Sequence, residues 1–291
     1  VEQYYWQWVS LKEKLKTLDV VGRQIDTIRR DVSTAVDAGV AMQNDLLQVE
    51  LERNRISANR LKVNNGLTVV KMLLAQAIEL PADSFDIAVS VPEDLPDPNI
   101  YKVDHQAALQ ITPTYRMLQK SVEASKLQRN MELGKRLPTI GIGAGYMYYD
   151  LPDQHSISVI ENRRSMGMVF ASIAIPLSDW WGGTHAIRQK NVQLKIAEES
   201  KRSNSELLLV QMQQLWNELV EAYDQAKISK ESVAKATENA RISTNCYHAG
   251  TVAVSDLLNA QSLLQQSRDQ YTDDLTTYFI KRTRYLQATG R

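Results

Sequence analysis

The sequence predicts a mainly α-helical protein, in which very long antiparallel, coiled-coil-like helices flank one inserted β-hairpin. Three segments repeat apolar or small residues at alternating spacings of four and three, the period of helices packed along a left-handed seam. A further segment, at about residues 138–178, alternates with the period of two that is typical of strands.

The composition limits the classes of function. Hydrophobic residues make up 43% of the chain and charged residues 23%, which favours a folded core over disorder. The 34 lysines and arginines balance 34 aspartates and glutamates, so we expect no nucleic-acid partner. The single cysteine, Cys246, excludes an internal disulfide and a cysteine-rich zinc site. No apolar run has the roughly 18 residues that a transmembrane helix needs.

Residues 1–80 are predicted to form a helix, a break and a second helix. The break is placed at Gly39, because glycine commonly takes a left-handed conformation just after a helix end. The first seam comprises Leu11, Leu15, Leu18, Gly22, Ile25, Arg29, Val32 and Val36. The second comprises Leu47, Leu51, Asn54, Ala58, Leu61, Asn65, Thr68, Met72 and Ala75.

Four prolines between Leu80 and Tyr101 predict a connection, at residues 81–103, rather than a helix. Within it, Phe85–Val91 alternates weakly and is compatible with a short edge strand. A helix is expected from about Asp104 to Leu137, with Pro113 near its start as a candidate first turn.

The hairpin has one apolar face. Ile140, Ile142, Tyr146 and Tyr148 alternate with glycines in the first strand, and Ser165–Leu177 forms the second. Each strand has about the 9–11 residues that cross a bilayer when tilted. The four residues are therefore candidates for contact with outer-membrane lipid, and a soluble sheet packed on a helix is the alternative. One hairpin leaves two open edges, so other strands must close them.

Two long helices follow, at about 184–246 and 251–288, with a break at Gly250. The seam of the first comprises Leu208, Met212, Leu215, Leu219, Ala222, Ala226, Ser229, Val233, Ala236, Ala240 and Ser243. The change from large to small seam residues predicts closer helix packing toward Ser243.

An internal repeat relates the two helix breaks. Ala38-Gly39 and the following Asp45-Leu46-Leu47 match Ala249-Gly250 and Asp256-Leu257-Leu258 at a constant offset of 211 positions (250 − 39). This indicates a duplicated helix–break–helix unit. We therefore expect a second repeat at 104–291 and a first repeat, 1–80, that lacks its leading helix and hairpin. A chain truncated at its N-terminus would explain the difference.

An ordered set of motifs resembles the TolC-like outer-membrane efflux proteins. Leu137-Pro138-Thr139-Ile140 opens one strand, Ile175-Pro176-Leu177 closes the next, and Trp181-Gly182-Gly183 opens the long helix. Tyr247-His248-Ala249-Gly250, the stretch from Asp256 to Gln261 and the closing Leu286–Gly290 complete the set.

The resemblance implies a homotrimer, a shared outer-membrane β-barrel and an α-helical barrel that continues across the periplasm of a Gram-negative bacterium. The chain would supply half of one protomer's contribution. It would act as the exit duct of a tripartite efflux or type I secretion system. A periplasmic adaptor (membrane fusion) protein and an inner-membrane transporter would be its partners. The resemblance implies passive transport, with no cofactor, no metal and no enzymatic activity.

The resemblance also implies a gate where the helix pairs break, at the narrow periplasmic end. Asp45 and Asp256 are similar to acidic residues of the aperture, and Tyr247 is similar to a tyrosine of the gate network. Asn259 stands where some members have a second aspartate, and Val252 where some have an arginine. An acidic ring would select cations. The alternative is that both aspartates only stabilise helix N-termini.

Other patterns carry less information. Gly141, Gly143 and Gly145 lack the spacing of a phosphate-binding loop. Cys246 and His248 are too few for a zinc site. Asp273 and Asp274 do not converge on a substrate, because adjacent helical positions diverge, and a solvated face is expected for them. The competing class of function is a soluble coiled-coil scaffold or a periplasmic adaptor-like protein.

Overall fold

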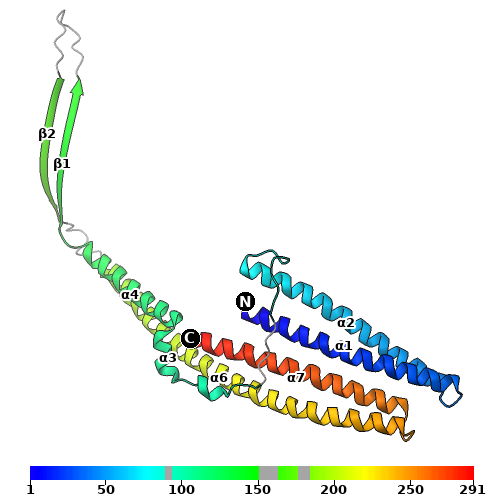
Figure 1. Ribbon diagram of the computed structural model, residues 1–291. Coiled ribbons are helices and arrows are strands. Elements are labelled where there is room, and N and C mark those ends of the chain that lie inside the picture. The colour runs from blue at the N-terminus through cyan, green and yellow to red at the C-terminus, as the bar shows by residue number, and fades with distance from the viewer. Residues whose placement is uncertain (89–93, 151–162, 176–183) are drawn as a thin grey trace, which may run out of the picture. The chain divides into compact units, whose positions relative to one another are not determined.

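The computed structural model describes residues 1–88, 94–150, 163–175 and 184–291 (Figure 1). The chain divides into two compact units, one formed by Val1–Thr112 with Leu208–Arg291 and the other by Pro113–Leu207. The first unit contains elements of both predicted repeats, because helices from the two ends of the chain pack on one another. Among the described residues, no helix combines the length and hydropathy of a membrane-spanning helix.

Helices α1 (Glu2–Asp37) and α2 (Gln43–Ile78) form an antiparallel pair. Along α1 the residues that become buried in this region are Leu18, Val21, Ile25, Ile28 and Val32, a run with the predicted period of 3.5. Two predicted positions were wrong: Ile28 takes the place of Arg29, and Val21 that of Gly22. The apolar neighbour is buried in each case, and the arginine points outward to Glu50 of α2.

The prediction for α2 was wrong for most of its seam. Val49 and Ile56 are buried against α1, whereas Leu47, Leu51, Leu61 and Met72 are exposed. Helix α2 carries apolar residues on more than one side, so a period of 3.5 fits two of its faces. The prediction chose the face with more leucines, which is the exposed one. The predicted Ala75 is buried.

Helices α6 (Thr184–His248) and α7 (Val254–Ala288) are the second long pair. The predicted seam of α6 is confirmed at six positions that are buried: Met212, Leu219, Ala222, Ala226, Ser229 and Ala240. An aromatic cluster joins α6, α7 and α1 at the end away from the breaks. Its centre is Trp6, whose ring stacks on Phe279 at 4.1 Å between centroids.

The connection between the repeats contains a 3-10 helix, η1 (Pro98–Tyr101). Phe85–Ala88 does not form a strand, and the rest of that predicted strand lies outside the described residues. The helix predicted from Asp104 is two helices, α3 (His105–Ile111) and α4 (Pro113–Gly134). Thr112 separates them in an extended conformation, because the residue before a proline avoids helical geometry.

Strands β1 (Thr139–Asp150) and β2 (Arg163–Ala174) pair antiparallel in a single two-stranded sheet. The register pairs Ile140 with Ile173 and Ile142 with Ala171, on the face opposite the glycines. On the glycine face Phe170 lies over Gly143, where an added Cβ would be 2.3 Å from the ring. A side chain at this position would displace the Phe170 ring.

Backbone geometry repeats at the predicted offset of 211 residues. Gly39 and Gly250 both have positive φ, 75° and 71°. The helix ends at Glu79 and Gly290 share the offset (290 − 79), with φ of 57° and 77°. Helices α2 and α7 begin at residues 43 and 254, again 211 apart (254 − 43). Matching helix starts and ends support the internal duplication that the sequence indicated.

Candidate functional site

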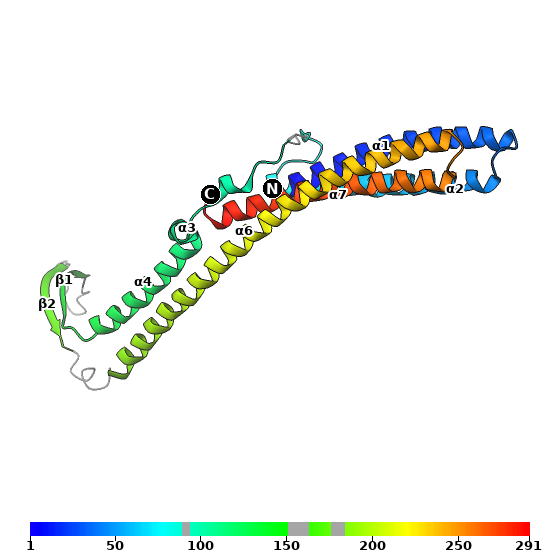
Figure 2. The same cartoon turned by 90° about the horizontal axis from the view of Figure 1, so that it is seen from below.

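The two helix breaks are built by the same hydrogen bonds. After α1, Gly39 N–H donates to Val36 O at 2.9 Å and Val40 N–H to Ala35 O at 2.9 Å. After α6, Gly250 N–H donates to Tyr247 O and Thr251 N–H to Cys246 O, each at 2.9 Å. Both are Schellman motifs, in which a left-handed residue satisfies the last helical carbonyls. Figure 2 shows that the two turns lie at the same end of the unit formed by Val1–Thr112 with Leu208–Arg291, which we call the helical unit.

Asp45 and Asp256 occupy the first turns of α2 and α7. The Asp45 carboxylate accepts a hydrogen bond from the Met42 N–H at 3.2 Å, three residues earlier. This is the helix-starting role that sequence reasoning offered as the alternative to an aperture role. Asp256 is exposed to solvent. A carboxylate at a helix start remains free to act on ions that pass it, so the two roles are compatible.

Tyr247 lies in the last turn of α6 and packs, partly buried, against the apolar cluster shared by α1, α2 and α7. Burial raises the pKa of its hydroxyl, and the carboxylates of Asp31 and Asp45 raise it further. Tyr247 therefore lies within electrostatic range of Asp45 and of Asp31, and sequence reasoning missed Asp31. The hydroxyl is protonated at neutral pH, as that of an unperturbed tyrosine also is, and it can donate to a carboxylate.

Asn259 lies exposed on α7. Within the described part of the chain, its side chain makes no hydrogen bond with Asp45 or with Tyr247. A groove of about 370 Å³ lies beside Tyr247, between α1 and the adjoining ends of α6 and α7. Arg23, Asp31 and His248 line it together with the buried Gln261. Of these four residues only His248 and Gln261 belong to motifs singled out in the sequence, and those motifs did not point to a groove.

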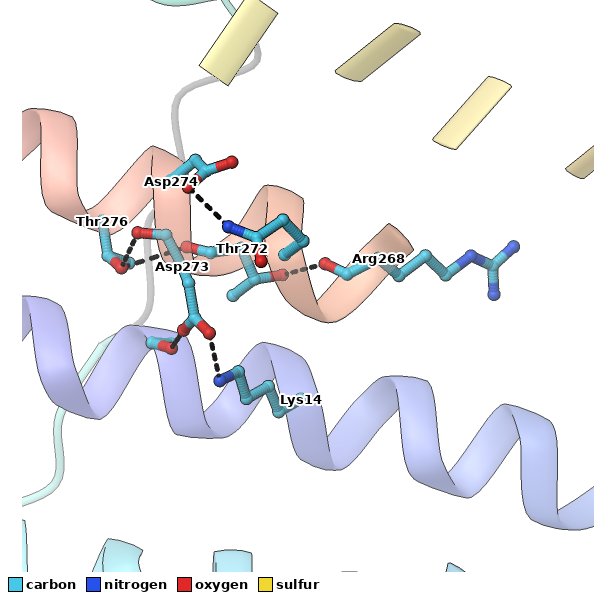
Figure 3. A network of polar contacts seen from close by, with 8 residues as sticks. Lys14, Arg268, Thr272, Asp273, Asp274 and Thr276 are labelled. Atoms are coloured by element: carbon cyan, nitrogen blue, oxygen red, sulfur yellow. Dashed lines mark hydrogen bonds and ion pairs between the residues drawn. The ribbon is translucent and has the colours of Figure 1, made fainter. Parts of the chain in front are cut away.

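A polar section interrupts the packing of α1 on α7 (Figure 3). The Lys14 ammonium lies 2.6 Å from the Asp273 carboxylate, which also accepts a hydrogen bond from Ser10 Oγ at 3.1 Å. Asp274 points away from α1 and accepts from Gln270 at 2.8 Å. The prediction of a solvated face was therefore wrong, because Asp274 is buried and Asp273 is paired across helices.

Asp269 belongs to the same polar section. Burial raises the pKa of its carboxyl, while Lys14 and a hydrogen bond with Gln265 act in the opposite direction. Asp273 also raises this pKa, since it is a second nearby negative charge. Polar residues at a spacing of four, Gln261, Gln265, Asp269 and Asp273, were the available sequence signal for this section.

Both faces of the hairpin are exposed, so burial in the single chain does not distinguish the predicted face from the other. Ile140, Ile142, Tyr146 and Tyr148 are all exposed, Ile142 to 82%. The other face carries Met147, Met166 and Met168 beside the glycines, and the register pairs Met147 directly with Met166. Among the described residues, no group of histidine, cysteine, aspartate and glutamate has the arrangement of a metal site.

Comparison with known proteins identifies the family. Residues 105–291 match the family described as Outer membrane efflux protein. The chain belongs to the outer membrane efflux protein family. The matched residues include the hairpin, α6, α7 and the second helix break, while Gly39 and Asp45 are related to them by the internal repeat. The description of the family places its members in the outer membrane and assigns them to efflux.

Several solved structures share the fold of this chain. The outer-membrane channel OprN superposes with a TM-score of 0.81 at 15% identity, over 99% of this chain and 64% of OprN. The CmeC outer membrane channel of Campylobacter jejuni gives 0.81 at 10% identity, over 99% and 61%. The open state of the MtrE channel of Neisseria gonorrhoeae gives 0.77 at 13% identity, over 99% and 64%. The chain therefore spans 64% of the OprN chain. None of the curated proteins matches it significantly.

Proposed function

We propose that the chain forms part of a passive outer-membrane exit duct in a tripartite efflux or type I secretion system. The observation that carries the proposal is the β1–β2 hairpin, one face of which is apolar and exposed along its length. Each strand has 12 residues, enough to cross the hydrocarbon core at a tilt. Ile140 and Ile142 would contact acyl chains, and Tyr146 and Tyr148 the interfacial region.

The hairpin requires further strands, since each strand of the pair leaves one edge of backbone groups without partners. Copies of the chain would supply them in a homotrimer. Helix α2 supports such an association, because Leu51, Leu61 and Met72 are exposed on it, Leu61 to 71%. The helical unit would then extend from the outer membrane into the periplasm.

The gate of the duct would lie at the helix breaks, where Gly39 and Gly250 turn the chain. Asp45, Tyr247, Asp256 and Asn259 would line its constriction. Carboxylates repeated in every copy would attract cations and repel anions, most strongly where the lumen is narrow. Tyr247 would donate from its protonated hydroxyl toward Asp31 or Asp45, and opening would break that contact.

The chain supplies no energy in this proposal. An inner-membrane transporter would drive export, and a periplasmic adaptor would couple the transporter to the helix-break end. The proposal needs no cofactor, since passage through a duct makes and breaks no covalent bond. The same end carries the groove beside Tyr247, and it is the end that a periplasmic partner would reach.

Two measurements on the purified chain test the proposal. Flotation with lipid vesicles measures membrane insertion, and single-channel recording in a planar bilayer measures conduction. We expect insertion and discrete, cation-selective steps. Asp45→Asn with Asp256→Asn should lower the cation selectivity and leave insertion unchanged, because the charges lie far along the chain from the hairpin.

The matched control is Asp83→Asn with Asp86→Asn, which removes the same charge from the exposed connection between the repeats. It should leave selectivity unchanged. A folded chain that stays in the aqueous fraction without detergent would overturn the proposal, and would favour the soluble coiled-coil scaffold. Selectivity that falls equally in both double variants would remove Asp45 and Asp256 from the constriction.

A further inference from the structure

The glycine face of the hairpin carries three methionines close together. Met147 of β1 and Met166 of β2 are directly opposite in the register, and Met168 follows on the same face two residues along. Opposite side chains in an antiparallel pair have Cβ atoms about 4.5–5.5 Å apart, and diagonal ones about 7–8 Å apart. Methionine is long and flexible, so the three thioethers can converge on one point.

The glycine face of the hairpin leaves room for the three methionine side chains. Met168 pairs with Gly145, and its Cγ would be 3.7 Å from a Cβ placed there. Phe170 fills the space above Gly143 further along. The three methionines are partly exposed, at 50%, 44% and 40%, so solvent ions can reach them. We call Met147, Met166 and Met168 the thioether cluster.

The chemistry of this face is unusual for its position. If Ile140 and Ile142 contact lipid, alternation turns the glycine face to the barrel interior. Interiors of membrane barrels that conduct are lined by polar side chains in water. Between Thr139 and Met147, and between Met166 and Ala174, this face has no charged residue. Thioethers interact weakly with water and with hard ions, and their distinctive property is affinity for soft metal ions.

We propose that the thioether cluster binds soft monovalent metal ions, Cu(I) and its analogue Ag(I), and that such ions are one class of substrate passing the hairpin. Two or three thioether ligands suit these ions, which sulfur donors select over divalent hard ions. Thioethers carry no proton, so binding releases none and does not depend on pH near neutrality. The proposal that transported ions contact the thioether cluster rests on the conduit proposed above. The proposal that the cluster binds these ions does not.

A neutral, solvent-exposed site is better suited to the passage of an ion than to its tight binding. Conduction requires ligands that hold an ion long enough to enter and weakly enough to leave. A thiolate would hold a soft ion far more tightly. Cys246, the only cysteine, lies at the end of α6, outside the hairpin.

Titration with Ag(I) nitrate in chloride-free buffer tests the binding. The full chain, in detergent and with Cys246→Ser to remove the thiol, is labelled with 13C at its methionine methyl groups. We expect the methyl signals of Met147, Met166 and Met168 to shift together. Those of Met117 and Met131, which are exposed on α4, should move only at much higher concentration. Potassium and zinc should produce no shift of the cluster.

Leucine variants locate the site, since leucine and methionine have similar volumes and the exchange preserves packing. Met147→Leu with Met166→Leu should abolish the concerted shift of Met168. The control, Met117→Leu with Met131→Leu, should preserve it. Uniform shifts of all exposed methionines, or full Ag(I) binding by the hairpin variant, would overturn the inference. Conductance without Ag(I) binding would refute only this inference, whereas Ag(I) binding without insertion would refute only the conduit.

Discussion

The seam between α1 and α2 and the seam between α1 and α7 share one helix but differ in chemistry. Along the first, Leu18 and Ile25 pack with Val49 and Ile56, and ion pairs lie outside the apolar line. The second is apolar near the breaks and aromatic at the other end. Between these ends it is polar, with Lys14 and Asp273 in contact.

The two seams illustrate two ways of joining helices: burial of apolar side chains and pairing of charged side chains. An apolar seam gains free energy from removing side chains from water, and it tolerates no loss of volume. A polar section gains little net energy, because each charge gives up hydration to reach its partner. We therefore expect the α1–α2 pair to be the stable half of the helical unit, and the middle of the α1–α7 seam to be the half that responds to conditions.

The largest expected effect comes from the apolar seam. Ile25→Ala removes a fully buried side chain and should destabilise the chain by about 2–4 kcal/mol. The midpoint of urea unfolding, followed by far-ultraviolet circular dichroism, measures it. The control Ile228→Ala removes the same atoms from an exposed position of α6, and should change stability by less than about 0.5 kcal/mol. Equal losses in both variants would contradict the assigned seam.

A smaller effect is expected in the polar section. Asp273→Asn removes the charge that pairs with Lys14 and should cost about 1 kcal/mol, since the Lys14 side chain is only 24% exposed and Asp273 also accepts a hydrogen bond from Ser10. The flanking pair of Asp26 with Arg53 on the α1–α2 side is half exposed, so Asp26→Asn should cost a few tenths of a kcal/mol at most. The same unfolding measurement compares them. A greater loss for Asp26→Asn would reverse this ranking.

The smallest effect should appear as a pH dependence. The raised pKa of Asp269 means that the folded chain binds its proton more tightly than the unfolded chain. Its contribution to stability is therefore present below the ordinary aspartate value of 3.8, and is lost as pH rises through the raised pKa. Asp269→Asn should raise the melting temperature at pH 7, and the gain over the parent should shrink on acidification. A gain that is constant with pH would assign it to packing instead.

Sequence periodicity predicted the long helices, the hairpin and the two breaks, because helices and strands differ in period and glycine permits positive φ. The prediction of buried residues failed where two neighbouring faces of one helix are both apolar. On α2, Leu51 and Leu61 match the seam as well as Val49 and Ile56, and only the position of α1 decides which become buried. Residues such as Asp31, which acts electrostatically on Tyr247 from another helix, depend on tertiary placement that no local pattern encodes.

The matching helix ends also constrain how the chain can change in length. Glu79 holds a left-handed turn where its counterpart is Gly290, so the residue has changed while the position of the turn has not. One residue inserted into α1 or α7 would rotate everything beyond it by about 100° and carry the buried line into solvent. Insertions and deletions should therefore be excluded from the paired helices and accommodated in the segment that joins the repeats, whose contacts with the helices, such as that of Pro96 with Tyr278, do not depend on a helical period.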